Sequence, residues 1–312
     1  MLALTFPGQG SQAVGMGKEL ADAFPEAKAV FDEVDEALGE KLSDVVWNGP
    51  DDPLTMTANA QPALMAVSIA ALRAMEARGF SLASASFVAG HSLGEYSALA
   101  AAGAISLSDT ARLLRIRGEA MQAAVPVGKG AMAAIIGLDM AAVDAICADA
   151  TDGDNACQIA NDNGGGQLVI SGHKEAVERA MEAASAAGAK RALALPVSAP
   201  FHSALMAPAA DRMAEALEAV EVKPVSVPLV CNVIAATIEQ PEDIRQRLVE
   251  QVTGRVRWEE SVSFMAKQGV TRMLEVGSGK VLSGLARRID RSIETAAIGT
   301  PADVDKAIEL IG

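Results

Sequence analysis

The chain has 312 residues, of which 50% are hydrophobic and 21% are charged. This composition supports a large buried core and excludes an intrinsically disordered protein. The 40 acidic residues outnumber the 26 basic ones, giving a formal net charge of −14. Nucleic acid and anionic membrane surfaces are therefore excluded as partners, because binding them requires a basic face.

The cysteines are few and far apart in the sequence: Cys147, Cys157 and Cys231. No C-x-x-C pair is present, so we expect no zinc site, and a sparse, odd number of cysteines is typical of reduced thiols. The chain shows neither a secretion signal nor an apolar run of about 18 residues that could span a membrane. We therefore expect a cytoplasmic protein.

Strands and helices alternate in the first part of the chain. The predicted elements are a strand at 2–6, helices at 19–38 and 61–79, a strand at 86–90, and helices at 95–104 and 107–124. Further strands are predicted at 227–233 and 272–277. This alternation is typical of an α/β fold with a largely parallel sheet.

A different order follows in the middle of the chain. It comprises a strand at 131–138, a helix at 141–150, strands at 157–162 and 166–172, a helix at 174–188 and a strand at 190–197. The order βαββαβ is that of a ferredoxin-like unit. We therefore predict a small domain, 127–198, inserted into a large domain made of 1–126 and 199–312.

The stretch "AGHSLGEYSAL" contains a G-x-S-x-G motif centred on Ser92. The motif alone is weak, but here a short apolar strand precedes it and a helix follows. This is the context of a nucleophile elbow, in which the helix N-terminus also offers free N–H groups to an oxyanion. The alternative is a turn in which Ser92 only caps the helix.

A nucleophilic serine needs a base, and the chain has three histidines, His91, His173 and His202. On a tight elbow the ring of His91 should point away from Ser92, and His173 begins a polar helix. His202 follows the predicted small domain, at a transition from loop to helix. By elimination, His202 is the predicted base, against the alternative of a loop histidine bonded to the backbone.

Arg117 is a charged residue on an apolar helix face. It shares a stripe with Leu113, Leu114 and Met121, whereas Arg112 and Arg115 lie off this stripe and should be solvated. A buried cation needs an anionic partner. The alternatives are an internal salt bridge and a bidentate site for a substrate carboxylate.

The loop "GQGSQA", residues 8–13, formally fits a dinucleotide-binding fingerprint. That fingerprint also requires an acid after a second strand, but Asp32 and Glu33 fall in a helical pattern. The other interpretation is that the glycines let the backbone N–H of Gln9 approach a ligand as an oxyanion donor.

Several motifs occur together and in order: "FPGQGSQ", "GHSLGEY", "RIRGEAM", "ANDN" with "GQLVISG", "VSAPFHSALM" and "QVTGRVRW". The combination covers nearly the whole chain and resembles the malonyl-CoA:acyl-carrier-protein transacylases. The resemblance implies an α/β-hydrolase-like large domain with a ferredoxin-like insertion. It also implies malonyl-CoA and acyl carrier protein as partners, in fatty acid synthesis, with no metal or redox cofactor.

The resemblance further implies a role for each matching residue. Ser92 would be the acylated nucleophile and His202 the general base, oriented by the backbone carbonyl of Gln251 in place of an acid. The remaining matches are the oxyanion donors Gln9 and Leu93, the carboxylate-binding Arg117, and the pocket residues Gln61, Asn161 and Phe201. The ring of Phe201 should disfavour an α-methyl group, so malonyl is expected over methylmalonyl.

A basic segment, "GSGKVLSGLARRIDRS", could receive an acidic carrier protein. We expect Arg287 and Arg288 to contact the carrier; the alternative is a solvated helix face. The loop "NGGGQ", 163–167, departs from the proline often found in relatives, and its three glycines predict a mobile loop.

Three other functions remain open. A serine thioesterase or esterase could use the same elbow, although Arg117 and the absence of a recognisable acid argue against it. A discrete acyltransferase for polyketide synthesis would use the same chemistry. A non-catalytic carrier-binding module would not need Ser92, His202 and Arg117 together.

Overall fold

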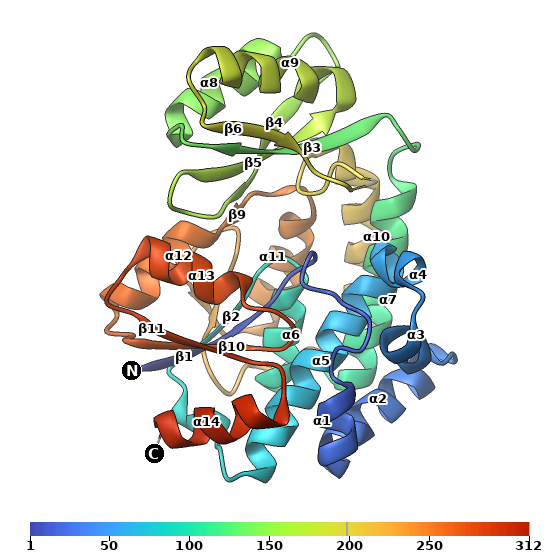
Figure 1. Ribbon diagram of the computed structural model, residues 1–312. Coiled ribbons are helices and arrows are strands. Elements are labelled where there is room, and N and C mark those ends of the chain that lie inside the picture. The colour runs from blue at the N-terminus through green and yellow to red at the C-terminus, as the bar shows by residue number, and fades with distance from the viewer. Residues whose placement is uncertain (198, 312) are drawn as a thin grey trace.

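Two β-sheets organise the chain, which the computed structural model describes over residues 1–197 and 199–311 (Figure 1). The larger sheet has the order β11-β10-β1-β2-β7-β8, and only β7 and β8 pair antiparallel. Its strands are β1 Leu2–Phe6, β2 Phe87–Gly90, β7 Leu229–Val230, β8 Thr237–Ile238, β10 Arg272–Val276 and β11 Glu294–Ile298. The predicted α/β fold with a largely parallel sheet is confirmed.

Helices cover both faces of this sheet. Their bounds are α1 Lys18–Ala23, α2 Pro25–Leu38, α3 Leu42–Asn48, α4 Asp51–Thr55, α5 Thr57–Ala77, α6 Gly94–Ala101, α7 Leu107–Ala123, α10 Ala207–Glu218, α11 Pro241–Thr253, α12 Trp258–Lys267, α13 Val281–Ile289 and α14 Pro301–Ile311. Short 3₁₀ turns lie at Leu82–Ser84 and Ala204–Met206.

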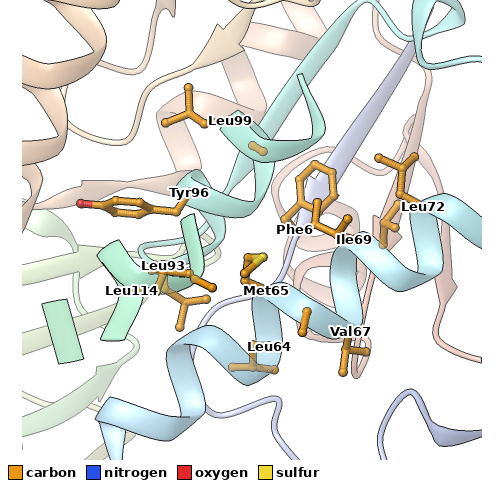
Figure 2. Close-up of a cluster of buried hydrophobic side chains, with 14 of the residues drawn as sticks. Phe6, Leu64, Met65, Val67, Ile69, Leu72, Leu93, Tyr96, Leu99 and Leu114 are labelled. Atoms are coloured by element: carbon orange, nitrogen blue, oxygen red, sulfur yellow. The ribbon is translucent and has the colours of Figure 1, made fainter. Parts of the chain in front are cut away.

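The alternation of side chains along β1 divides the core. Leu4 and Phe6 belong to the main core with α5, α6 and α7, whereas Ala3 faces a smaller cluster with α12 and α13. Figure 2 shows part of the main core, with Phe6 of β1 beside Met65 and Ile69 of α5. Since successive strand residues point to opposite faces, the apolar run of β1 fits a strand buried on both sides.

The smaller sheet has the order β6-β3-β5-β4-β9. Its elements are β3 Gly130–Ile136, α8 Met140–Ala150, β4 Cys157–Asp162, β5 Gln167–His173, α9 Lys174–Ala186, β6 Arg191–Ala194 and the two-residue strand β9 Val256–Arg257. The βαββαβ order of the ferredoxin-like unit is thus present, and β9 from the later chain adds to it in parallel with β4. The boundaries 127–198 and 199–312 stay predictions; residues 198 and 312 lie outside the described residues.

Three predicted elements differ in detail. The helix predicted at 19–38 is divided at Phe24, which is extended because a residue before proline avoids the helical region. The helix α5 begins four residues before the expected start and contains Pro62, which occupies its sixth position rather than its first. The strand predicted at 227–233 is only β7, because Cys231 enters a turn closed by its N–H to the Ala236 carbonyl.

Two glycines allow β2, α6 and β1 to meet closely. A Cβ on Gly90 would lie 1.9 Å from the carbonyl of Gly94, and one on Gly94 would lie 2.2 Å from the Phe6 carbonyl oxygen. Backbone atoms cannot move away as a flexible side chain can. The turn between β2 and α6 therefore requires glycine at both positions.

We predict that Gly90→Ala destabilises the protein by about 3 kcal/mol or more, because the added methyl group overlaps the backbone of Gly94 and Glu95. The matched control is Gly284→Ala on α13, where an added Cβ meets nothing within 4 Å. This change should stabilise by about 0.5–1 kcal/mol, since alanine is the better helix former. Denaturant unfolding of both variants tests the prediction, and equal midpoints would contradict it.

Candidate active site

Ser92 lies at a sharp turn between β2 and α6. Its backbone is left-handed, with φ of 54°, a conformation that is uncommon for any residue except glycine. Its hydroxyl does not cap the helix: no side-chain cap is found at the start of α6 in the described chain. The strand–turn–helix context predicted from the G-x-S-x-G motif is therefore present, and the capping alternative is wrong.

His202 is the histidine that reaches Ser92. Its Nε2 lies 2.7 Å from Ser92 Oγ, and its ring is buried, with 3% of the residue exposed. On the other side, Nδ1 lies 2.9 Å from the Gln251 carbonyl oxygen and 3.1 Å from the Gly254 carbonyl oxygen. Carbonyls only accept hydrogen bonds, so Nδ1 carries the proton and Nε2 is free to accept the Ser92 proton.

The environment of His202 keeps the imidazole neutral. Burial, followed by the nearby charge of Arg117, lowers the pKa of His202 to about 3. The hydrogen bonds to the backbone carbonyls of Gln251 and Gly254 oppose this shift. His202 is therefore in the proton-accepting form at neutral pH.

Arg117 is buried beside this pair, with 2% of the residue exposed. Nη1 donates to Gln61 Oε1 at 2.7 Å, and Nη2 donates to Gln251 Oε1 at 2.8 Å and to Ser92 Oγ at 3.2 Å. No carboxylate among the described residues forms an ion pair with it, which removes the internal salt-bridge alternative within that range. Burial lowers the pKa of Arg117, but a guanidinium stays charged in proteins. The site thus holds a buried cation next to the serine with no carboxylate in direct contact, although the charge of Glu95 acts on it through space.

The other two arginines of α7 differ from each other. Arg112 is exposed and pairs with Asp109, as expected for a solvated side chain. Arg115 is only 19% exposed and forms an ion pair with Glu40, so the expectation that it is solvated is wrong. Its partner Glu40 lies two residues after the last residue of α2, a helix that packs against α7.

The two residues predicted to carry the oxyanion donors lie at the same cavity. Gln9 and Leu93 both line the cavity at Ser92, and neither N–H has a recorded hydrogen-bond acceptor in the described chain. The side chain of Gln9 is fixed, because its Oε1 accepts from Thr57 Oγ1 at 2.9 Å, and Thr57 in turn accepts from Gln61 Nε2. The 8–13 loop does not open a helix directly, since α1 begins only at Lys18.

The cavity has a volume of about 540 Å³. Residues around the larger sheet and residues of the smaller sheet, such as Met132 and Asn161, both line it. Ser92, His202, Arg117, Gln61, Asn161 and Phe201 all line it. Gln61 and Asn161 are buried, while Phe201 is half-buried and, with Met121 and Met132, gives the cavity apolar walls. Gln251 lies behind this lining, fully buried.

The other two histidines lie outside the Ser92–His202 pair. His91 Nε2 lies 2.8 Å from Asn163 Oδ1, and its ring packs near Trp258; burial lowers the pKa of His91. His173 Nδ1 accepts from the Ala156 N–H. The packing and hydrogen-bonding role expected for His91 is confirmed, whereas His173 is only partly exposed.

The glycine loop 163–167 is hydrogen-bonded. All three glycines have positive φ, and the loop is closed by Asn163 N–H to the Gln167 carbonyl and by Gly137 N–H to the Gly166 carbonyl. It packs on α13, where Arg288 Nη1 donates to Gln167 Oε1 at 3.2 Å. Glycine here permits a left-handed turn that proline cannot adopt. Its predicted mobility stays a prediction.

Arg287 and Arg288 are both exposed on α13. Arg287 Nη2 donates to the Thr295 carbonyl oxygen, and neither arginine forms an ion pair with another described residue. The loop before α13 contacts the 8–13 loop, since Ser278 Oγ donates to the Ser11 carbonyl oxygen at 2.6 Å. The two charges lie in the last turn of α13, and no residue of that helix lines the cavity.

The described range holds neither a metal-binding cluster nor a membrane-spanning helix. No three His, Cys, Asp or Glu residues are grouped in residues 1–197 and 199–311 so as to hold a metal ion. The same part of the chain contains no helix that is both long and apolar enough to cross a bilayer. Cys147, Cys157 and Cys231 are free and buried.

Sequence reasoning missed three residues that hold the site together. Asn232 Oδ1 accepts from Ser92 N–H at 2.8 Å, Glu95 Oε2 accepts from Gln251 Nε2 at 2.6 Å, and Thr57 connects Gln61 with Gln9. Asn232 and Glu95 lie in no local pattern that indicates a contact with residues more than a hundred positions away.

The model of the family described as "Acyl transferase domain" matches residues 4–289 of the chain. The chain belongs to this acyl transferase family. Its elbow serine, histidine base candidate and buried arginine all lie within the matched segment.

The acyl transferase is similar to curated proteins over nearly its full length. It is 48% identical to the malonyl CoA-acyl carrier protein transacylase of Bacillus subtilis, covering 99% of this chain and 97% of that protein. It is 47% identical to the protein of the same name from Escherichia coli, covering 99% of each.

Solved structures agree with this acyl transferase in fold. The acyl-carrier-protein-S-malonyltransferase of Bartonella henselae is 58% identical, with a TM-score of 0.97, covering 100% of this chain and 99% of that chain. A malonyl-transacylase solved in complex with its type II PKS acyl-carrier protein is 46% identical, with a TM-score of 0.96 and coverage of 99% of each chain.

Proposed function

We propose that the protein transfers the malonyl group of malonyl-CoA to the phosphopantetheine thiol of acyl carrier protein, supplying fatty acid synthesis. The observation that carries this proposal is a buried, unpaired guanidinium, Arg117, within 3.2 Å of a serine hydroxyl that is itself 2.7 Å from a neutral histidine. The pair performs acyl transfer, and the guanidinium selects an acyl group that ends in a carboxylate. The names of the relatives support the same reaction.

In the first half-reaction, His202 Nε2 takes the proton of Ser92 as Oγ attacks the thioester carbonyl carbon. The N–H groups of Gln9 and Leu93 stabilise the oxyanion, and Leu93 also lies at the start of α6, where the helix dipole is favourable. The carbon–sulfur bond breaks, and the coenzyme A sulfur takes the proton from His202. The product is a malonyl ester on Ser92.

The second half-reaction runs the same steps in reverse. The carrier thiol gives its proton to His202 and attacks the ester carbonyl, and Ser92 Oγ leaves with that proton. Atoms and electrons balance without a metal or a redox group, so we propose no cofactor. The kinetics should be ping-pong.

Arg117 has a second effect in this proposal. Its charge lowers the pKa of His202 while the site holds no anion. A malonyl carboxylate bound to Arg117 would offset that charge and make His202 a stronger base. The carboxylate would thus improve the reaction of the acyl group that carries it, besides fixing its position.

The half-buried ring of Phe201 supports the proposed preference for malonyl over methylmalonyl, because it lines the cavity close to Met132. Gln61 and Asn161 are proposed to contact the acyl group, and the backbone carbonyl of Gln251 to orient the base. Three free buried thiols support a proposed cytoplasmic location, since reduced cysteines are typical there.

A second candidate is the same transfer in polyketide synthesis. The complex of a 46% identical malonyl-transacylase with a type II PKS carrier protein favours it specifically. The two candidates share the acyl donor and the chemistry, and differ only in the carrier that discharges the enzyme. A serine thioesterase or esterase is distinguished by releasing free acid instead.

The proposed function is tested by incubating the protein with malonyl-CoA in the absence of carrier and measuring its intact mass. We expect one malonyl adduct, absent in Ser92→Ala and discharged by added carrier protein. Steady release of malonate without an adduct would identify a hydrolase. An adduct that persists in Ser92→Ala would contradict the assignment of the nucleophile.

Truncation in Arg117→Ala should slow malonyl transfer by about 2–5 kcal/mol of transition-state free energy, because the substrate carboxylate then lies buried without a partner. Acetyl transfer, which places no carboxylate there, should fall much less. Comparison of kcat/KM for malonyl-CoA and acetyl-CoA measures the difference. Equal losses for the two acyl groups would refute the carboxylate site.

We propose that Arg287 and Arg288 contact the acidic carrier protein. Reversal of both charges, R287E with R288E, should raise KM for the carrier and leave the rate of loading from malonyl-CoA unchanged. The matched control is Arg212→Glu, which reverses the charge of an exposed arginine on a different helix, α10. A carrier KM that rises equally in the control would disprove the docking site.

A further inference from the structure

Glu95 is a fully buried carboxyl group that the proposed reaction does not use. It lies in the first turn of α6, with 0% of the residue exposed, and no lysine or arginine of the described chain forms an ion pair with it. Its Oε2 accepts from Gln251 Nε2 at 2.6 Å and from the Asn232 backbone N–H at 3.3 Å. Burial of a carboxylate is unfavourable. The role of Glu95 is therefore sought in the two groups that donate to it.

Both donors hold the backbone of the nucleophile. Asn232 Oδ1 accepts from Ser92 N–H at 2.8 Å, and Asn232 Nδ2 donates to the Gly90 carbonyl oxygen at 2.7 Å. Gln251 Nε2 donates to the Ser92 carbonyl oxygen at 3.0 Å. The side chains of Asn232 and Gln251 therefore bind the peptide groups on both sides of the left-handed Ser92, and one carboxylate oxygen of Glu95 connects the Gln251 side chain with the Asn232 backbone N–H.

Gln251 extends this arrangement to the base and to the cation. Its backbone carbonyl accepts from His202 Nδ1, and its side-chain Oε1 accepts from Arg117 Nη2. A carboxylate accepts hydrogen bonds only, so Glu95 forces the amide nitrogen of Gln251 towards itself. The amide oxygen must then face Arg117. With the amide reversed, Nε2 would point its protons at the guanidinium.

We propose that the ionised carboxylate of Glu95 is the positioning residue that sets Ser92, His202 and Arg117 in their reactive arrangement, through Asn232 and Gln251. The positioning of Ser92 by Glu95 would matter for any acyl donor. The functional importance of positioning Arg117 rests on the proposed malonyl transfer.

The proposal has a pH signature. Burial raises the pKa of Glu95 to about 7, against the hydrogen bonds from Gln251 and Asn232 and the charge of Arg117, which lower it. The titratable or charged groups facing it are Arg117 on α7, Cys231 after β7 and Tyr96 on α6. Burial raises the pKa of Cys231 and raises that of Tyr96 to about 12, while that of His202 lies at about 3. Glu95 is thus the group of this set that changes charge near neutrality.

The sign follows from which form accepts hydrogen bonds. Above a pH of about 7, Glu95 is ionised and holds both donors; as the pH falls through this value, protonation weakens the arrangement. The reactivity of Ser92 should therefore fall on the acid side of neutrality, well above the pH at which His202 takes up a proton.

The test measures the rate at which an alkyl fluorophosphonate labels Ser92, a reaction that needs the serine, the base and the oxyanion donors but no carboxylate on the reagent. Wild type, Glu95→Gln and Asp35→Asn are compared from about pH 5 to about pH 9. Asp35 is the matched control: a buried carboxylate, 5% exposed, that accepts from Ser43 N–H and Oγ and lines no part of the cavity.

We expect Glu95→Gln to label about 10- to 100-fold more slowly than wild type at about pH 8.5, and at nearly the wild-type rate at about pH 5. Asp35→Asn should lose stability and keep the wild-type pH profile. Equal labelling rates of Glu95→Gln and wild type at high pH would overturn the proposal. A variant that is slowed but whose labelling rate still falls on the acid side of neutrality would overturn it too. If Glu95→Gln does not fold, the wild-type pH profile decides the question. A wild-type labelling rate that stays constant through neutral pH would refute the proposed role of Glu95.

Loading from malonyl-CoA is followed in the same samples by intact mass. Wild type that reacts with the fluorophosphonate but gains no malonyl group would contradict the proposed function while leaving the role of Glu95 towards Ser92 standing. A slowed Glu95→Gln that also loses its preference for malonyl over acetyl supports the part of the proposal that concerns Arg117.

Discussion

The left-handed backbone of Ser92 is the constraint on which the site depends. A φ of 54° is unfavourable for serine, and it persists because both neighbouring peptide groups are hydrogen-bonded by Asn232 and Gln251. Gly90 and Gly94 give the room for the turn, and β1 supplies the surface on which it rests. The cost of the strained residue is thus offset by contacts from β2, α6, the end of β7 and α11 together. In return, the hydroxyl stands clear of the turn, within reach of His202 and Arg117.

The electrostatics of the cavity follow from burial without an ion pair. Arg117 lies among amide oxygens and a serine hydroxyl, none of which is charged. Such a site is costly in the free protein and favours any small ligand that carries one negative charge. Phe201, Met121 and Met132 make the rest of the lining apolar, so in the proposed reaction the charge would select the end of the acyl group and the walls would limit its breadth. The charge of Arg117 also lowers the pKa of His202, so the same guanidinium acts on the base as well as on the bound ligand.

The sequence predicts those parts of the site that have a local signature. Ser92 is marked by glycines two positions away on each side, and Arg117 by its place on an apolar stripe. His202 follows only by elimination among three histidines. Asn232 and Glu95 have no such signature, because a buried polar residue is explained by partners that distant segments bring to it. The same limit applies to β7, where a run of apolar residues predicts a strand but cannot show that a turn begins at Cys231.

The two-residue strand β9 has a mechanical consequence. It pairs with β4 of the smaller sheet and begins two residues after Gly254, whose carbonyl accepts from His202 Nδ1. Gln158 of β4 also donates to the carbonyl oxygens of His202 and Thr253. A rotation of the smaller sheet away from the larger one would pull on this segment and lengthen the hydrogen bonds that orient the imidazole. The position of the smaller sheet is therefore coupled, through β9 and Gln158, to the hydrogen bonds that orient the imidazole.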